Sequence, residues 1–204
     1  MCPRLAAFRR QNRAAFPDFH NNPVPSFGPL DAKLLIVGLA PGLKGANRTG
    51  RPFTGDYAGD LLYGSLKRLD LAQGEYRARR DDGFTLNGVR ITNAVRCVPP
   101  ENKPLPVEVH TCRAFLIAEI GAMTELRVIL ALGQIAHQSV ISTLALKRKE
   151  HSFTHGARGT ASHLGKPIAI FASYHCSRYN TSTGVLTQAM FEEVLAAAKA
   201  AAGL

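Results

Sequence analysis

The chain has 204 residues, of which 46% are hydrophobic and 20% are charged, and these proportions exclude a disordered chain. This length suits one compact domain over residues 1–204 and is short for two. A formal net charge of +10 favours a polyanionic partner such as nucleic acid, although charge alone specifies no chemistry.

The N-terminal segment is expected to form a helical arm over about residues 3–30, with a helix at 3–16 before a turn-rich stretch at 21–29. Its first ten residues include three arginines but no apolar run of signal-peptide length. No later window reaches the roughly 18 apolar residues that a membrane span requires. We therefore expect a cytoplasmic, nucleoid-associated protein without a membrane partner.

Four short apolar runs predict buried strands, and they lie at residues 33–38, 89–93, 127–132 and 167–172. Segments of helical character lie between or after them, at residues 59–69, 106–123, 134–144 and 187–202. This alternation predicts an α/β fold, a single-domain three-layer sandwich with a four-stranded, mainly parallel sheet and helices on both faces. The proline-rich stretch at 98–106 is expected to be an ordered loop.

The predicted strands end in residues suited to binding or catalysis, among them Asn93 after the second strand and His175 after the fourth. Because parallel strands have their carboxyl ends at one edge of a sheet, we expect a ligand site there. The loop after the first strand has glycines that let backbone N–H groups approach a ligand closely. Its residues are Gly38, Leu39, Ala40, Pro41 and Gly42. Neither nucleotide-binding glycine spacing is present, whereas a purely structural turn remains an alternative.

Three motifs occur in order along the chain: GLAPG at 38–42, GANRTGRPFTGD at 45–56 and HCSRYNTSTGVLT at 175–187. Together they resemble family 5, or type B, of the uracil-DNA glycosylase superfamily, and the likeness extends from CPRL at 2–5 to the final helix. The resemblance implies a monofunctional glycosylase that hydrolyses the N-glycosidic bond of uracil flipped out of DNA. Such an enzyme leaves an abasic site for base excision repair.

The resemblance implies two catalytic residues, Asp56 and His175. An ionised Asp56 would orient or activate water and stabilise positive charge on the sugar. His175 would donate a hydrogen bond to uracil O2 as negative charge grows on the base. Ala40 stands where many relatives carry an acidic or amide side chain, so acid-base work would fall to Asp56. The alternatives are a helix N-cap for Asp56 and a structural role for His175.

Phe53 and Asn93 would recognise the base, together with the loop at 38–42. Phe53 offers a flat face for stacking a pyrimidine, with ordinary core packing as its alternative. The Asn93 amide has a donor and an acceptor that match uracil O4 and N3–H and oppose the cytosine pattern. Because the first loop has little polarity, hypoxanthine and other deaminated bases are also expected substrates.

The loop after His175 resembles one that enters the DNA minor groove, where Arg178 or Tyr179 would act as a wedge. Basic side chains at the rim would contact phosphates, with solvated surface as their alternative role. The predicted DNA-binding residues are Arg48, Arg51, Lys103, Ser177, Arg178, Tyr179 and Asn180.

Cys2, Cys97 and Cys112 match ligands of the structural iron–sulfur (4Fe-4S) cluster that the resembled family carries. The fourth ligand, expected three positions before Cys2, is not found in this chain. Thiolates also suit zinc, so the identity of the metal depends on the resemblance. Cys176 adjoins the expected active site and is not an expected ligand.

Two other functions remain open: a non-catalytic nucleic-acid-binding module of the same fold, and a hydrolase of free nucleotides. For the glycosylase, the expected partners are DNA that contains uracil or another deaminated base, and free uracil as the product. The chain is expected to act as a monomer.

Overall fold

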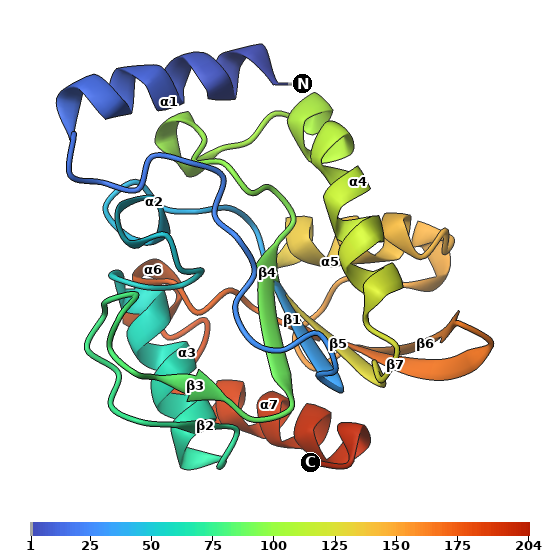
Figure 1. Ribbon diagram of the computed structural model, residues 1–204. Coiled ribbons are helices and arrows are strands. Elements are labelled where there is room, and N and C mark those ends of the chain that lie inside the picture. The colour runs from blue at the N-terminus through green and yellow to red at the C-terminus, as the bar shows by residue number, and fades with distance from the viewer. Residues whose placement is uncertain (1) are drawn as a thin grey trace.

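A computed structural model describes residues 2–204, with a five-stranded sheet at its centre (Figure 1). The strand order is β4-β1-β5-β7-β6. The first four strands of this order are parallel, and β6 pairs antiparallel with β7. The strands of this sheet are β1 (Leu34–Gly38), β4 (Val89–Asn93), β5 (Val128–Leu132), β6 (Arg158–His163) and β7 (Lys166–Ser173), and a small second sheet pairs β2 (Ala72–Gln73) with β3 (Thr85–Leu86).

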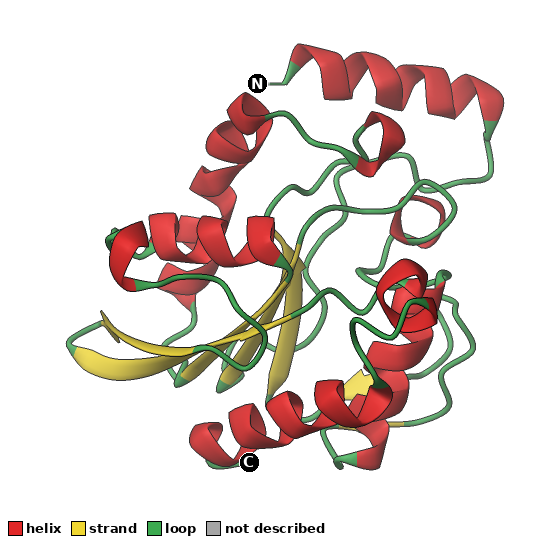
Figure 2. Ribbon diagram, turned by 180° about the vertical axis from the view of Figure 1, so that it is seen from behind, coloured by secondary structure: helices red, strands yellow, loops and turns green. Residues whose placement is uncertain are grey.

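Helices cover both faces of the main sheet, which confirms the predicted three-layer α/β arrangement. The longer helices are α1 (Pro3–Ala15), α3 (Tyr57–Arg68), α4 (Pro106–Ala122), α5 (Gln134–Thr143) and α7 (Gln188–Ala202). The short ones are α2 (Ala46–Thr49), α6 (Arg178–Ser182) and the 3-10 turns η1 (Pro100–Asn102) and η2 (Arg148–Glu150). Figures 1 and 2 show the sheet between α4 and α5 on one side and α3 and α7 on the other.

The two faces of β1 show how the sequence produces these layers. Successive side chains of a strand point to opposite faces. Leu34 and Ile36 belong to the core cluster that includes residues of α3 and α7, whereas Leu35 and Val37 belong to the cluster with α4 and α5. All four side chains are fully buried, and each such burial contributes about 1.5–3 kcal/mol. A continuous apolar run is therefore what a strand covered on both faces requires.

The prediction of four strands was one strand short, because β6 lies at the edge of the sheet. Its sequence, RGTASH, alternates exposed and half-buried positions and lacks the apolar run of a central strand. Leu164 and Gly165 join β6 to β7, and both have a positive φ, as a two-residue hairpin turn requires. Polar composition concealed this strand in the sequence.

The carboxyl ends of the parallel strands meet at one edge of the sheet, where β1 ends at Gly38, β4 at Asn93 and β7 at Ser173. The loops that continue β1 and β4 stay side by side, because the backbone N–H of Val95 donates to the carbonyl of Leu39 at 2.9 Å. Helix α1 lies at the end of the molecule away from the C-terminus (Figure 1). Across residues 2–204, no helix combines the length and apolarity needed to cross a membrane.

Candidate active site

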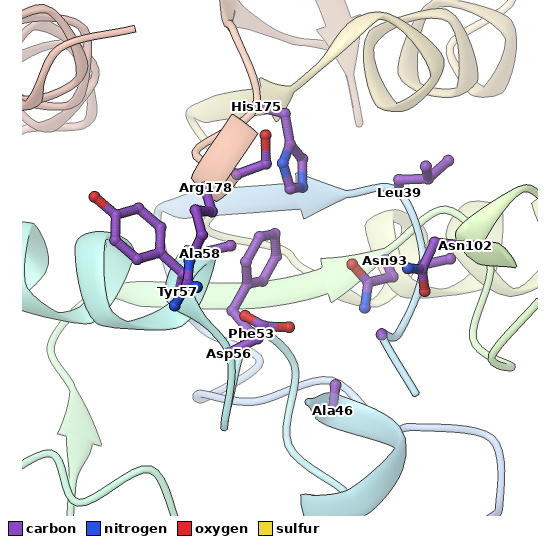
Figure 3. Close-up of a pocket in the computed structure, with 13 residues that line it drawn as sticks. Leu39, Ala46, Phe53, Asp56, Tyr57, Ala58, Asn93, Asn102, His175 and Arg178 are labelled. Atoms are coloured by element: carbon purple, nitrogen blue, oxygen red, sulfur yellow. The ribbon is translucent and has the colours of Figure 1, made fainter. Parts of the chain in front are cut away.

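A cavity of about 480 Å³ opens at this edge of the sheet, within the volume range of small-molecule sites. Several predicted site residues meet there although they are far apart in the sequence. Its lining consists of Leu39, Ala40, Gly42, Ala46, Phe53, Asp56, Tyr57, Ala58, Asn93, Asn102, His175, Ser177 and Arg178 (Figure 3).

Phe53 lies at the middle of the view in Figure 3, with His175 and Asp56 on opposite sides of its ring. The ring stacks near the imidazole of His175, with centroids 6.0 Å apart and planes inclined by 27°. Gly38 lies beneath it: a Cβ added there would be 2.4 Å from both Phe53 Cζ and Asn93 Oδ1. Gly38 therefore contributes space for these two side chains instead of a wall of the cavity.

Asp56 caps α3 and lines the cavity at the same time. Its Oδ1 accepts a hydrogen bond from the backbone N–H of Gly59 at 3.2 Å, so the alternative N-cap role is present. Its Oδ2 faces the first loop, because a Cβ added at Gly45 would lie 2.2 Å from that oxygen. Burial raises the pKa of the Asp56 carboxyl above its ordinary value, although its backbone hydrogen bonds oppose the shift.

His175 follows β7 and lies half-buried in the cavity wall. Its backbone is fixed by Asn180, whose Nδ2 donates to the His175 carbonyl at 2.8 Å. Gly133, with φ 93°, leaves room beside it, since an added Cβ would lie 3.3 Å from His175 Cβ. Burial lowers the pKa of the imidazole, so the ring is neutral at pH 7 and can donate through one N–H.

Asn93 ends β4 and is 6% exposed. No side-chain hydrogen bond ties its amide to another residue in the described part of the chain. The amide donor and acceptor are thus available to a molecule in the cavity, where Asn93 is part of the lining.

Not every predicted site residue lines the cavity. Arg51 was predicted to contact phosphate, and this is corrected by its burial: it is 3% exposed and its Nη1 lies 2.7 Å from Asp82 Oδ1. A guanidinium held in this way is not available to DNA. The remaining predicted residues outside the cavity lining are Gly38, Pro41, Arg48, Lys103, Tyr179 and Asn180.

Asn102 is a cavity residue that the sequence did not reveal, and Ala46, Tyr57 and Ala58 line the cavity as well. Asn102 lies at the end of η1, within the proline-rich loop that was predicted only as ordered. Its φ of 57° is left-handed, a conformation in which Asn is enriched. An Asn in a loop of fixed shape was the available signal, although its direction could not be predicted without the fold.

The loop after His175 forms the short helix α6, which Ser177 caps by accepting from the Asn180 backbone N–H at 3.4 Å. Tyr179 projects from it with 75% of its surface exposed. The Arg178 guanidinium lies 5.5 Å from the centre of the Tyr57 ring, beside the cavity. This helix therefore combines polar, cationic and aromatic groups next to the cavity.

Cys2, Cys97 and Cys112 line a separate hollow of about 390 Å³ between α1 and α4. Arg9 Nη1 donates to Cys97 Sγ at 3.3 Å, and the Arg96 backbone N–H donates to Cys112 Sγ at 3.4 Å. Burial raises the pKa of both the Cys97 and the Cys112 thiol. Within residues 2–204, no three His, Cys, Asp or Glu side chains form a preassembled metal-binding group.

Comparison with known proteins agrees with this geometry. A family model described as "Uracil DNA glycosylase superfamily" matches residues 25–199. The chain is 44% identical to the type-5 uracil-DNA glycosylase of Thermus thermophilus, over 100% of this chain and 94% of that protein. It is 39% identical to the type-5 enzyme of Pyrobaculum aerophilum, over 99% and 88%, and 33% identical to the type-4 enzyme of that organism, over 77% and 72%. The chain therefore belongs to the uracil DNA glycosylase superfamily.

Proposed function

We propose that this protein is a monofunctional uracil-DNA glycosylase, which hydrolyses the bond between uracil N1 and deoxyribose C1′ and leaves an abasic site. One observation carries the proposal: Asp56, His175, Phe53 and Asn93 line a single cavity at the carboxyl edge of the sheet. Family membership and similarity to type-5 enzymes over the whole chain give independent support.

The base would enter the cavity from an extruded nucleotide, because the reacting bond is inaccessible inside the duplex stack. There it would stack on Phe53, and the free Asn93 amide would pair with uracil O4 and N3–H. Cytosine presents the opposite donor and acceptor at these positions. A mismatched pairing would leave buried polar groups unsatisfied, at about 1–3 kcal/mol each.

Cleavage moves the bonding electron pair onto uracil and leaves positive charge on the sugar. The neutral His175 N–H would stabilise negative charge at uracil O2, and the Asp56 carboxylate would stabilise the cationic sugar. Water then adds to C1′ and gives up a proton, for which Asp56 is the available base. Uracil leaves as an anion that takes up a proton from solvent, so no lysine nucleophile is needed.

For the DNA contacts, we assign the wedge to Tyr179, since it is the more exposed aromatic side chain on α6 and 75% of its surface is accessible. Arg48, Lys103 and Arg178 are exposed cations that suit phosphate contacts, and Ser177 and Asn180 organise the helix between them. We expect the enzyme to act as a monomer at the nucleoid and to accept hypoxanthine and other deaminated bases beside uracil.

We further propose that Cys2, Cys97 and Cys112 hold a structural iron–sulfur cluster, with a fourth ligand outside this set. The support is the hollow that the three thiols share and the two N–H groups that point at sulfur. When bound, the cluster would join α1 to the loop before α4, and it would take no part in hydrolysis. Visible absorption and iron content of purified protein test this directly, with Cys97→Ser as the variant that should lose both.

The proposed activity is tested with a duplex that has one uracil in a labelled strand. Incubation with the protein followed by alkali should cut the strand at the uracil, and a thymine duplex should stay intact. Binding of the uracil duplex without cleavage would favour a non-catalytic module. Release of base from free deoxyuridine monophosphate, without cleavage of the duplex, would favour a nucleotide hydrolase.

A further inference from the structure

A buried ion pair lies behind the cavity. Arg51 Nη1 and Nη2 donate to the two carboxylate oxygens of Asp82 at 2.7 and 2.8 Å. The side chains are 3% and 0% exposed. Asp82 also accepts from the backbone N–H groups of Arg77 and Phe84, each at 3.1 Å. This carboxylate therefore has four charge-assisted or backbone donors, and it ties the segment between β2 and β3 to Arg51.

Aromatic rings enclose the guanidinium on its other sides. The Arg51 Cζ lies 5.0 to 6.0 Å from the ring centres of Phe27, Tyr63, Tyr76 and Phe84. Cations are attracted to such ring faces, and the attraction is stronger when water is excluded. Burying a charge is costly unless it is paired and hydrogen-bonded, so this site is built around the ion pair.

The same network fixes the backbone on either side of Phe53. Arg51 Nε donates to Thr54 Oγ1 at 2.8 Å, and Thr54 Oγ1 donates to the Pro52 carbonyl at 3.1 Å. The Tyr63 hydroxyl donates to that carbonyl as well, at 2.6 Å. The Tyr76 hydroxyl contacts the Phe53 carbonyl at 3.4 Å. Residues 51–55 are thus held from behind, on the side away from the cavity.

Phe53 itself is in a left-handed conformation, with φ 51°. For a bulky residue this costs on the order of 1–3 kcal/mol and persists only where the surroundings enforce it. Gly59 of α3 permits it, because a Cβ there would lie 1.7 Å from the Phe53 carbonyl oxygen. The strained backbone directs the ring into the cavity, next to His175.

We infer that the Arg51–Asp82 pair is a positioning device for the base pocket, which holds Phe53 in its strained conformation and Asp56 at the start of α3. The inference rests on the proposed function and assigns a role in it to the loop between β2 and β3. Arg51 and Asp82 touch no part of the cavity lining themselves, so they act through Phe53 and through the segment that ends at Asp56.

The test is inhibition by free uracil together with single-turnover cleavage of the uracil duplex. Asp82→Asn keeps the shape of the side chain and removes its charge. We expect both the affinity for uracil and the cleavage rate to fall on the order of 10- to 100-fold, as misplacement of reacting groups does. Tyr63→Phe, which leaves the Pro52 carbonyl a second donor in Thr54, should weaken uracil inhibition a few-fold and keep the fold.

Glu119→Gln is the matched control, because Glu119 is 7% exposed and pairs with Arg90 and Arg96 away from the cavity. It should lower the Tm without changing uracil inhibition. The inference fails if Asp82→Asn and Tyr63→Phe lower only the Tm and, while folded, match the wild type in both assays. If Asp82→Asn does not fold, the Tyr63→Phe result decides. A wild-type protein that does not cleave uracil DNA would instead contradict the proposed function.

Discussion

The ring of Phe53 and the imidazole of His175 stack with centroids 6.0 Å apart and planes inclined by 27°. One residue comes from a loop before α3 and the other from the end of β7, so the fold alone brings them together. An apolar ring face beside a neutral imidazole offers an extruded pyrimidine both a stacking surface and a hydrogen-bond donor.

The first prediction concerns that stacking surface. Phe53→Leu keeps an apolar side chain and removes the flat face, so free uracil should bind more weakly by about 1–3 kcal/mol. Competitive inhibition of duplex cleavage measures this loss. Phe191→Leu, in the fully buried core on α7, should lower the Tm and leave uracil inhibition unchanged. Equal uracil inhibition in Phe53→Leu and the wild type would contradict a stacking role.

A second prediction uses the space around the Asp56 carboxylate. A Cβ at Gly45 would lie 2.2 Å from Asp56 Oδ2, whereas a Cβ at Gly42 would lie 3.3 Å away. Gly45→Ala should therefore displace the carboxylate and slow single-turnover cleavage on the order of 100-fold, and Gly42→Ala should have a smaller effect. Gly121→Ala meets no atom within 4 Å and serves as the control. A reversed order of the two effects would show that the carboxylate is not held there.

The third prediction concerns pH. Asp56 acts as a carboxylate, and burial raises its pKa above the model-compound value of 3.8. Cleavage should therefore fall as pH decreases, and this acid limb should lie above pH 3.8. The measurement is the single-turnover rate across the acidic range, with folding followed in parallel by circular dichroism. A rate that stays constant down to the pH at which the protein unfolds would exclude this titration.

A fourth prediction concerns the choice of base. Asn93→Asp keeps the size of the side chain but replaces the amide donor with an acceptor, which repels uracil O4. Uracil excision should fall by about 1–3 kcal/mol, the cost of an unsatisfied buried group. Duplexes that contain uracil or cytosine, compared at equal enzyme concentration, measure the change in preference. An unchanged uracil rate would remove Asn93 from base recognition.

The sequence predicted the central sheet and its helices well, because buried parallel strands such as residues 34–38 are continuous apolar runs. It did not predict β6, whose polar, half-exposed residues look like a loop. The cavity residues Asp56, His175, Phe53 and Asn93 could be predicted because they follow strands or lie in recognisable motifs. Their convergence needed only the rule that parallel strands end at one edge.

Other parts of the site depend on contacts that no local pattern encodes. Arg51 lies in the same motif as Phe53, yet its guanidinium turns inward because Asp82, far along the chain, neutralises it. Asn102 reaches the cavity because two consecutive left-handed residues, Glu101 and Asn102, turn the proline-rich loop toward it. Surface and interior arginines have the same sequence signature, and only the fold separates them.

The most direct test of the central claim is Asp56→Asn in single-turnover cleavage of a uracil duplex. The amide cannot stabilise a cationic sugar or accept a proton from water, so the rate should fall by about 10²- to 10⁴-fold while duplex binding is retained. Because Asn is an equally good N-cap and removes a buried charge, the Tm at pH 7 should not fall. Cleavage by this folded variant at the wild-type rate would contradict the account.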